Sequence, residues 1–331
     1  MTEITRRNLG KLAAGAGVGS IAALSAPAVF AASNMTKMHV GALPLVDFAP
    51  LFAAQKNGYF KAERIDLTLT PSPGGTPAFT ALASGDLDAC VSSNIADLVV
   101  AGRGLIFPLI GCAAAVGKGF PEDVGGLVVP KGSKMKSGKD WNHKRIGVNL
   151  LDSIAWLCVR EWVDKHGGDS STLSFVEIPF PQLNDALLNK RVDAVQQNEP
   201  FISALLQDNP TKVEVISWVF SEVLPNGLIS GIYASKNYIA KNKTQVEAFS
   251  HAYNKGVVWV RDNMKKQPLY DLISGYSKLP VAKLQHLLTW PRFETKVSPS
   301  DFHRQAEAML KYKMLTKIPD VEELVFSAVK A

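Results

Sequence analysis

The stretch ALASGDLDA at residues 81–89 returns in altered form as ALLNKRVDA at residues 186–194. Both copies begin with Ala-Leu, and both end with Leu or Val followed by Asp-Ala. In each place a helical pattern ends, a turn follows, and an apolar strand begins. Coincidence among common residues is the alternative explanation, but both copies fall in corresponding α/β units. The repeat therefore predicts two similar halves in one chain.

Short apolar runs alternate with helical patterns around both copies of the repeat. In the first half the predicted strands are 38–43, 65–70, 88–93 and 105–113, and the helices are 49–60, 74–85 and 94–102. In the second half the predicted strands are 144–150, 175–179, 192–197 and 213–220, and the helices are 153–168, 181–191 and 200–208. After an apolar run at 228–235 the chain is predicted to be helical, notably at 245–264 and 298–315. Strands separated by helices of about ten residues are typical of parallel α/β sheets.

Two segments that contain Pro and Gly mark where the chain changes from one half to the other: GGLVVPKGS at 125–133 and LPNGLISG at 224–231. We therefore expect lobe I to comprise 36–125 plus 228–331 and lobe II to comprise 126–227. Because the chain crosses twice, the connectors form a two-strand hinge, which suits closure on a ligand. The predicted fold class is α/β, with two lobes that each hold a mainly parallel sheet flanked by helices.

The composition is that of a soluble globular protein. The chain has 331 residues, 47% of them hydrophobic and 20% charged, which suits two domains that each bury a core. The formal net charge of +6 is spread without a basic run, so nucleic-acid binding is not expected.

Residues 1–31 have the pattern of an export signal. Arg6 and Arg7 precede an apolar stretch at 12–26 that is short for a membrane span of roughly 20 residues. Small residues at Val29 and Ala31 would permit cleavage before residue 32. The paired arginines suggest twin-arginine export and therefore a periplasmic protein. An uncleaved N-terminal anchor is the alternative.

Three cysteines, Cys90, Cys112 and Cys158, lie in apolar runs and are predicted to be buried small hydrophobic residues. A Cys90–Cys112 bridge is the alternative if their strands are adjacent. The six histidines are scattered without zinc-type spacing, so we expect no metal site and no cofactor.

Ligands of open parallel sheets bind outside the carboxyl ends of the strands, where helices begin. Lobe I offers the candidate ligand-binding residues Asp47, Phe48, Gly74, Gly75, Thr76, Ser93, Asn94 and Ala113. Lobe II offers Asp152, Ser153, Phe180, Asn198 and Glu199. Helix capping is an alternative role for Thr76, Asn94, Ser153 and Glu199, and core packing is one for Phe48 and Phe180.

Charge narrows the ligand class. The candidate loops contain Asp47, Asp152 and Glu199 but no arginine, since Arg145 and Arg191 stand at strand beginnings on the opposite side. A doubly charged anion gripped by bidentate arginine is therefore disfavoured. A neutral, zwitterionic or nitrogen-bearing solute fits better, as does a monoanion held by helix-start amides.

Several segments together resemble the solute-binding proteins of nitrate/sulfonate/taurine-type ABC importers. In family order they are APLFAAQKNGYFKAERIDLTL (49–69), PGGTPAFTALASGDLDA (73–89), GGLVVPKGS (125–133), KDWNHKRIGV (139–148), DALLNKRVDAVQQNEPF (185–201) and the helical ending. The resemblance covers about residues 38–325 and implies a type II-like periplasmic-binding-protein fold. It further implies a small organic solute, sulfonate- or taurine-like or nitrogen-bearing, held between the lobes and passed to an inner-membrane ABC permease. A monomer is expected.

Two other functions remain open on the same scaffold. One is an enzyme resembling pyrimidine synthases or small-acid dehydratases, and the other is a periplasmic sensor subunit. The predicted cleft holds no histidine, Ser/His/Asp arrangement or cofactor lysine, so we predict that the protein is not an enzyme.

Overall fold

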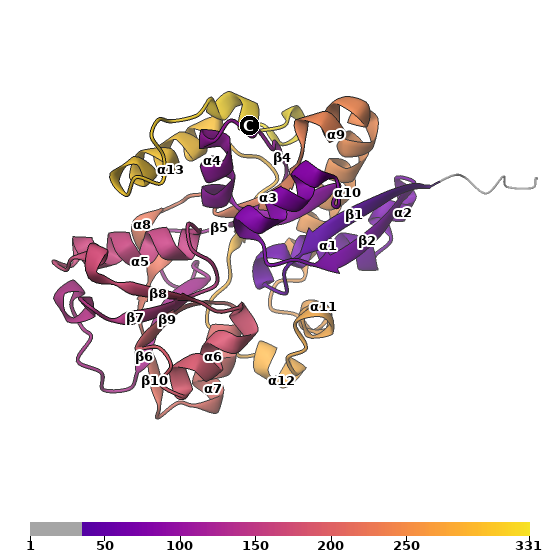
Figure 1. Ribbon diagram of the computed structural model, residues 1–331. Coiled ribbons are helices and arrows are strands. Elements are labelled where there is room, and N and C mark those ends of the chain that lie inside the picture. The colour runs from indigo at the N-terminus through magenta and orange to yellow at the C-terminus, as the bar shows by residue number, and fades with distance from the viewer. Residues whose placement is uncertain (1–34) are drawn as a thin grey trace, which may run out of the picture. The chain divides into compact units, whose positions relative to one another are not determined.

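Two five-stranded sheets, each flanked by helices, make up the computed structural model, which describes residues 35–331 (Figure 1). The predicted export signal, residues 1–31, lies outside the described residues. The strands are β1 Thr36–Ala42, β2 Ile65–Pro71, β3 Ala89–Ser93, β4 Leu109–Cys112, β5 Ala114–Ala115, β6 Gly125–Pro130, β7 Arg145–Val148, β8 Ser174–Glu177, β9 Ala194–Asn198, β10 Val213–Trp218, β11 Ser230–Ala234 and β12 Arg292–Phe293. The helices are α1 Ala49–Lys56, α2 Tyr59–Ala62, α3 Gly75–Ser84, α4 Asn94–Gly102, α5 Ile154–Lys165, α6 Phe180–Leu188, α7 Phe201–Asp208, α8 Val219–Val223, α9 Lys236–Lys241, α10 Lys243–Asp262, α11 Gln267–Ser277, α12 Val281–Leu284 and α13 Pro299–Lys311.

The two sheets have the same strand order. The first runs β2-β1-β3-β11-β4, and the second, taken from the matching edge, runs β8-β7-β9-β6-β10. In each sheet the first three strands are parallel, and the fourth, β11 or β6, is antiparallel to both neighbours. That fourth strand is the one that the chain forms directly after crossing from the other sheet. We call each sheet with the helices packed on it a lobe, lobe I for the first sheet and lobe II for the second.

The repeated stretch of sequence makes the same junction in both lobes. The Asp88 carboxylate accepts a hydrogen bond of 2.7 Å from the backbone N–H of His39, and the N–H of Asp88 donates to the carbonyl of His39 at 2.9 Å. Asp193 makes the same pair of bonds with Arg145, both at 2.8 Å. Each aspartate therefore ties the start of the central strand to its parallel neighbour. Corresponding positions in corresponding units confirm the prediction of two similar halves.

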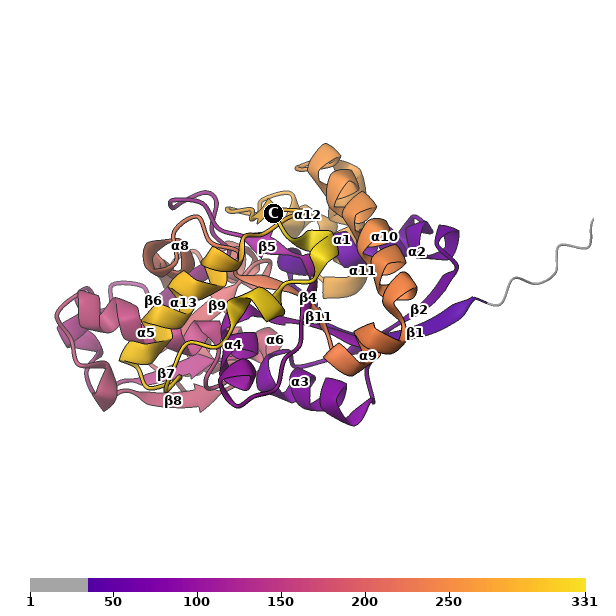
Figure 2. The same cartoon turned by 90° about the horizontal axis from the view of Figure 1, so that it is seen from above.

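Helices cover both faces of each sheet. Figure 2 shows α10 on one face of the first sheet and α3 on the other. Figure 1 shows α5 on one face of the second sheet, with α6 and α7 on the opposite face. The helix predicted at 245–264 corresponds to α10, which buries one apolar stripe: Val246, Phe249, Tyr253, Val257 and Val260. None of the helices in the described residues is both long and apolar enough to cross a membrane.

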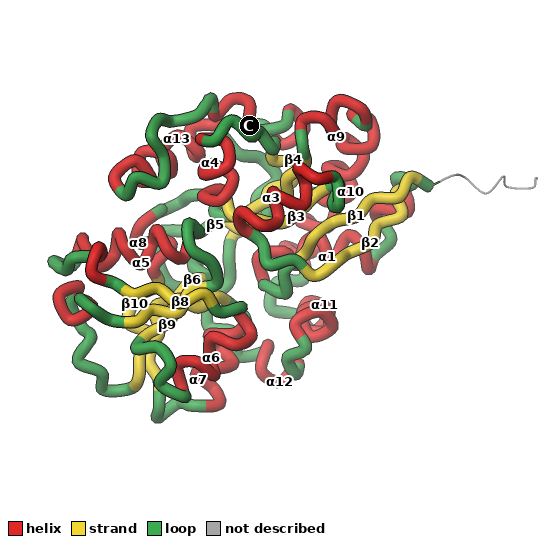
Figure 3. The backbone as a smooth tube through the Cα atoms, in the orientation of Figure 1, coloured by secondary structure: helices red, strands yellow, loops and turns green. Residues whose placement is uncertain are grey.

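The two connectors between the lobes are hydrogen-bonded to each other. The backbone N–H of Ile229 donates to the Ala114 carbonyl at 2.9 Å, and that of Val116 donates to the Gly227 carbonyl at 3.0 Å. These bonds form an antiparallel ribbon, which is the expected two-strand hinge. Figure 3 shows the strands of the two sheets as separate groups joined by loops.

The C-terminal part of the chain contacts both lobes. Helix α11 packs on α1 of lobe I, whereas α12, immediately after it, packs on α7 of lobe II. Helix α13 packs on α4 of lobe I, and the hydroxyl of Tyr312 just beyond it donates to Glu161 at 2.6 Å and to Asp164 at 2.8 Å. Both acids lie on α5 of lobe II. The chain after β11 thus bridges the lobes in addition to the hinge.

Several predicted elements differ from the observed ones. The helix expected at 49–60 is split into α1 and α2, because Gly58 has a left-handed φ of 74°. Helix α3 follows Gly74 directly, so the prediction that Thr76 caps this helix is wrong. The strand expected at 105–113 is confined to Leu109–Cys112. The strand expected at 213–220 ends at residue 218 because the carboxylate of Asp123 accepts from the N–H of Ser221 at 2.6 Å, which favours the turn into α8.

All three cysteines are buried and free, as predicted for small hydrophobic residues. Strand β11 lies between β3, which carries Cys90, and β4, which carries Cys112. The alternative of a Cys90–Cys112 bridge is therefore wrong, since an intervening strand separates the two thiols.

Candidate functional site

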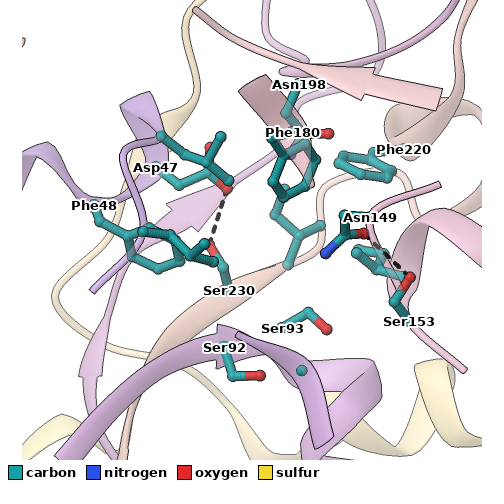
Figure 4. A pocket seen from close by; sticks show the side chains of 15 residues that line it. Asp47, Phe48, Ser92, Ser93, Asn149, Ser153, Phe180, Asn198, Phe220 and Ser230 are labelled. Atoms are coloured by element: carbon teal, nitrogen blue, oxygen red, sulfur yellow. Dashed lines mark hydrogen bonds between the residues drawn. The ribbon is translucent and has the colours of Figure 1, made fainter. Parts of the chain in front are cut away.

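A pocket lies between the lobes, at the carboxyl ends of their strands and beside the hinge (Figure 4). The cavity volume is about 40 Å³, which is room for a few waters. The lining residues from lobe I are Leu43, Leu45, Asp47, Phe48, Gly75, Ser92, Ser93, Ile229 and Ser230. Those from lobe II are Asn149, Ser153, Ile154, Phe180, Asn198 and Phe220.

The lining follows from the shared sheet order. Ser93 and Asn198 are the last residues of β3 and β9, the two strands that begin in the repeated stretch. Gly75 and Ser153 stand where α3 and α5 begin. Equivalent strand ends from the two lobes therefore face one cavity.

Asp47 is the only acidic or basic side chain among the lining residues. It is 3% exposed; its Oδ2 accepts a hydrogen bond of 3.2 Å from the Ser230 hydroxyl, and its Oδ1 has no partner within the described part of the chain. Burial raises the pKa of Asp47 to about 7, although backbone and Ser230 hydrogen bonds oppose this shift. Ser230 also accepts from the backbone N–H of Ala114 at 3.2 Å, which links Asp47 to the hinge ribbon.

Besides Ser230, three serines line the pocket, and two of them also cap helices. Ser93 accepts from the N–H of Ala96 at 3.3 Å, and Ser153 accepts from the N–H of Trp156 at 3.3 Å. The hydroxyl of Ser92 is buried and has no partner in residues 35–331. Ser92 is therefore the serine with the most hydrogen-bonding capacity left for a ligand.

The apolar part of the lining includes three aromatic residues beside four aliphatic ones. Phe48 comes from lobe I, whereas Phe180 and Phe220 come from lobe II and lie near each other in Figure 4. An apolar wall with a few polar groups is typical of small-molecule sites.

Three predicted site residues lie behind the pocket instead of lining it. The side-chain amide of Asn94 donates to the Leu228 carbonyl at 2.7 Å and accepts from the Tyr233 hydroxyl at 2.6 Å, so it is used within the core. The backbone N–H of Ala113 donates to the carbonyl of Ser230 at 3.0 Å, within the hinge region.

Glu199 is the third of these residues. Its carboxylate accepts from the N–H and the hydroxyl of Ser203 at 3.1 and 2.6 Å, which caps α7, the alternative role considered from the sequence. Burial raises its pKa to about 7, against the effect of these hydrogen bonds. Its backbone carbonyl accepts from the N–H of Val46 at 3.3 Å, a direct contact between the lobes.

Gly74, Thr76 and Asp152 lie next to the pocket but do not line it. A Cβ at Gly74 would stand 2.7 Å from a methyl group of Leu43, which does line the pocket. The remaining predicted residues, Asp47, Phe48, Gly75, Ser93, Ser153, Phe180 and Asn198, are brought together at the pocket.

The sequence-based list missed eight lining residues: Leu43, Leu45, Ser92, Asn149, Ile154, Phe220, Ile229 and Ser230. Some of these could have been found: Ser92 and Asn149 are the next-to-last residues of predicted strands, and Phe220 is the last residue of the strand predicted at 213–220. Ile229 and Ser230 belong to the second crossing, to which the strand-end rule does not apply.

Comparisons with known proteins agree with this architecture. The family model described as NMT1/THI5 like matches residues 46–266. No curated protein sequence matches the chain.

Among solved structures, the alkanesulfonate-binding protein SsuA from Xanthomonas axonopodis pv. citri, bound to MOPS, is 19% identical; the match covers 91% of this chain and 100% of that one, with a TM-score of 0.72. The periplasmic aliphatic sulphonate-binding protein SsuA from Escherichia coli is 15% identical over 89% and 98% of the two chains, with a TM-score of 0.69. The periplasmic nitrate-binding protein NrtA from Synechocystis PCC 6803 is 12% identical over 89% and 86%, with a TM-score of 0.73.

At these identities the structural likeness shows the fold, which is the predicted two-lobed fold of periplasmic binding proteins. The family match extends from the residues just after β1 into the helical C-terminal part and includes the whole of lobe II. The chain therefore belongs to the NMT1/THI5-like family.

Proposed function

We propose that this chain is the periplasmic solute-binding component of an ABC import system. A small organic solute, sulfonate- or taurine-like or nitrogen-bearing, binds in the pocket between the lobes, and the closed protein delivers it to a permease in the inner membrane. The observation that carries the proposal is the pocket, to which both lobes contribute strand ends and helix starts beside a two-strand hinge. The resemblance of the fold to sulfonate- and nitrate-binding proteins supports it.

The proposal includes the division of the chain made from the sequence. Residues 1–31 act as a twin-arginine export signal, lobe I comprises 36–125 plus 228–331, and lobe II comprises 126–227. The sheet order supports this division, because β6 to β10 form one sheet while β1 to β4 and β11 form the other. A monomer suffices, since one chain supplies both sides of the pocket.

Binding is coupled to closure because a solute in this pocket would touch both lobes at once. Lobe contacts such as Val46 N–H to the Glu199 carbonyl, at 3.3 Å, form only when the lobes are together. A solute at 100 times its dissociation constant would add about 2.7 kcal/mol to the free energy of unfolding.

Catalysis is not part of the proposal. Asp47 stands without a lysine, histidine or cysteine among the lining residues, whereas nucleophilic or acid–base catalysis generally pairs such groups. The alternative functions make different predictions: an enzyme would turn its substrate over, and a sensor subunit would bind a receptor instead of a permease. A turnover assay and a permease pull-down separate them.

The test is native mass spectrometry of the gently purified protein for a bound solute, followed by thermal-shift screening of sulfonates, pyrimidines and small nitrogenous acids. We expect the screen to identify a solute that stabilises the wild-type protein. Its stabilising effect should be lost in Asn149→Ala, which removes a pocket side chain, and retained in Asn189→Ala, at the exposed C-terminal end of α6. A solute that stabilises both variants equally would place binding elsewhere and overturn the proposal.

A further inference from the structure

The buried ionisable groups nearest the pocket are all acidic. Asp47 lines the cavity, Asp123 lies in the first connector, and Glu199 follows the end of β9. Arginine, lysine and histidine are absent from the lining residues. The lining side chains therefore supply negative charge from Asp47 and no positive charge that could pair with an anion such as sulfonate or nitrate.

Two of these three carboxylates are already satisfied. The oxygens of Asp123 accept from the N–H groups of Gly125 and Ser221, at 2.8 and 2.6 Å. Glu199 accepts from Ser203 and from the Thr289 hydroxyl. Asp47 differs, because Oδ2 is held by Ser230 while Oδ1 is buried without a partner in the described residues.

An unpartnered carboxylate oxygen in a cavity is a strong acceptor. A buried acceptor left unpaired is unfavourable, and more so when it is charged, so a donor supplied by a ligand favours binding. Asp97 also has two buried oxygens without a partner in residues 35–331, but it does not line the pocket. Asp47 is thus the carboxylate that a bound solute can reach.

The aromatic residues favour the same kind of ligand. Phe48, Phe180 and Phe220 all line the cavity that Asp47 enters (Figure 4). The face of an aromatic ring attracts a cation, and the attraction is strongest where water is excluded. An anion at the same place would be repelled by the ionised Asp47 carboxylate.

We propose that the solute is a small organic cation, whose protonated amine donates a hydrogen bond to Asp47 Oδ1 while Ser230 holds Oδ2 and the three phenylalanines enclose its apolar part. This inference rests on the proposed solute-binding function and specifies its substrate class. Polar groups such as the Ser92 hydroxyl take further N–H donors of the same solute.

The test compares three four-carbon probes that differ in charge: n-butylamine, n-butanol and butane-1-sulfonate. Binding is measured by calorimetry at about pH 8, where the amine is protonated and Asp47 is ionised. The wild-type chain is compared with Asp47→Asn, which keeps the shape of the side chain, and with Asp185→Asn on the exposed face of α6.

We expect n-butylamine to bind the wild-type chain and Asp185→Asn at least tenfold more tightly than Asp47→Asn, and more tightly than either other probe. Thermal unfolding without ligand checks that Asp47→Asn is folded. Tighter binding of butane-1-sulfonate than of n-butylamine to the wild-type chain overturns the cation proposal. So does a solute without a basic nitrogen found by native mass spectrometry, and in that case the solute-binding function stands. If no probe binds and no solute co-purifies, both proposals fail.

Discussion

The two lobes share their strand order but differ in how they use their carboxylates. Lobe I presents Asp47 to the pocket with one oxygen unpaired. Lobe II has Glu199 at the end of its central strand, but this carboxylate turns away and caps α7 through Ser203. An acidic group thus lies near the pocket on each side, although the two follow non-equivalent strands, β1 and β9, and only Asp47 remains available to a ligand.

The residues that hold the two sheets together are alike in both lobes, whereas the residues that face the ligand differ. Asp88 and Asp193, which occupy the same place in the repeat, make the same strand-tying bonds in both lobes. Positions that hold the scaffold together have thus stayed alike, whereas positions at the opposite strand ends differ, as Ser93 and Asn198 do. The following predictions test where the equivalence of the lobes ends.

The largest effect is expected from pH and the buried carboxyls. Burial raises the pKa of Glu199 to about 7, so the folded chain holds this proton more tightly than the unfolded chain does. The resulting stabilisation is complete near pH 4 and is lost as the pH rises to about 7. Glu199→Gln removes the ionisable group, so its stability relative to the wild type should improve by about 3 kcal/mol between pH 4 and pH 8, whatever the substitution costs in hydrogen bonds to Ser203 at pH 4. Denaturant unfolding between these pH values measures the difference.

Asp47 provides the matching experiment in lobe I. Its pKa is also raised to about 7, so the Asp47→Asn change should flatten the same part of the pH–stability curve. The groups that face it are Ser230, Asp123, Tyr253 and Tyr276. Curves for both variants that run parallel to the wild type would contradict the burial of charge in both lobes.

A smaller effect is expected where the lobes touch at Gly75. A Cβ at Gly75 would stand 2.6 Å from a methyl group of Leu150, which follows β7 in lobe II. Gly75→Ala should cost about 1–2 kcal/mol for its left-handed φ and up to about 1 kcal/mol more for the clash, because the contacted methyl group is the end of the Leu150 side chain and can shift. Gly85→Ala is the matched control, because Gly85 also has a positive φ but nothing within 4 Å of the added Cβ.

Adding Leu150→Ala to Gly75→Ala should remove the cost of the clash and leave that of the backbone. Small-angle scattering should show Gly75→Ala populating a more open arrangement than Gly85→Ala. If the two glycine variants are equally stable and equally closed, the lobes do not meet at this point in solution.

The equivalence of the repeat can be tested by Asp88→Ala and Asp193→Ala. Each change removes a carboxylate that accepts from the neighbouring strand, and each should lower the free energy of unfolding by about 1–1.5 kcal/mol. Chemical denaturation of the two variants should give similar losses, with a slightly larger one for Asp193→Ala, because Asp193 also pairs with the Arg145 guanidinium at 3.4 Å. If only one of the two variants loses stability, the two aspartates do not have equivalent structural roles in the two lobes.

The smallest effect is expected at the contact between α13 and α5. Tyr312→Phe removes the hydroxyl that donates to Glu161 and Asp164 and should cost about 1 kcal/mol. Tyr238→Phe, on α9, serves as the control. Thermal unfolding measures the loss of stability, and small-angle scattering shows whether the lobes open more readily. If Tyr312→Phe behaves like the control in both measurements, these hydrogen bonds do not help to hold the lobes together.

Much of the fold was predictable because it depends on local patterns. The periodicity of apolar residues located the strands and helices, and Ser153 was correctly expected to cap α5. Errors arose where a contact distant in the sequence decides the backbone. The turn into α8 is one example, since it depends on Asp123, far away in the sequence.

The candidate site was predictable in part for the same reason. The strand-end rule finds residues such as Ser93 and Asn198, because parallel strands bring their carboxyl ends to one edge. It does not find Ile229 or Ser230, which reach the pocket from the second crossing. It also does not distinguish Asp47 from Glu199, because both follow a strand and only one is satisfied by its own helix.

The sequence by itself determined that this protein has two matched α/β halves, because hydrophobic periodicity and the Asp-Ala junctions are local properties of each half. Only the tertiary structure decided which polar groups face the pocket. Hydrogen-bond partners such as Ser203 for Glu199 and Ser230 for Asp47 are supplied by the folded chain, and they determine which carboxylate is left for a ligand.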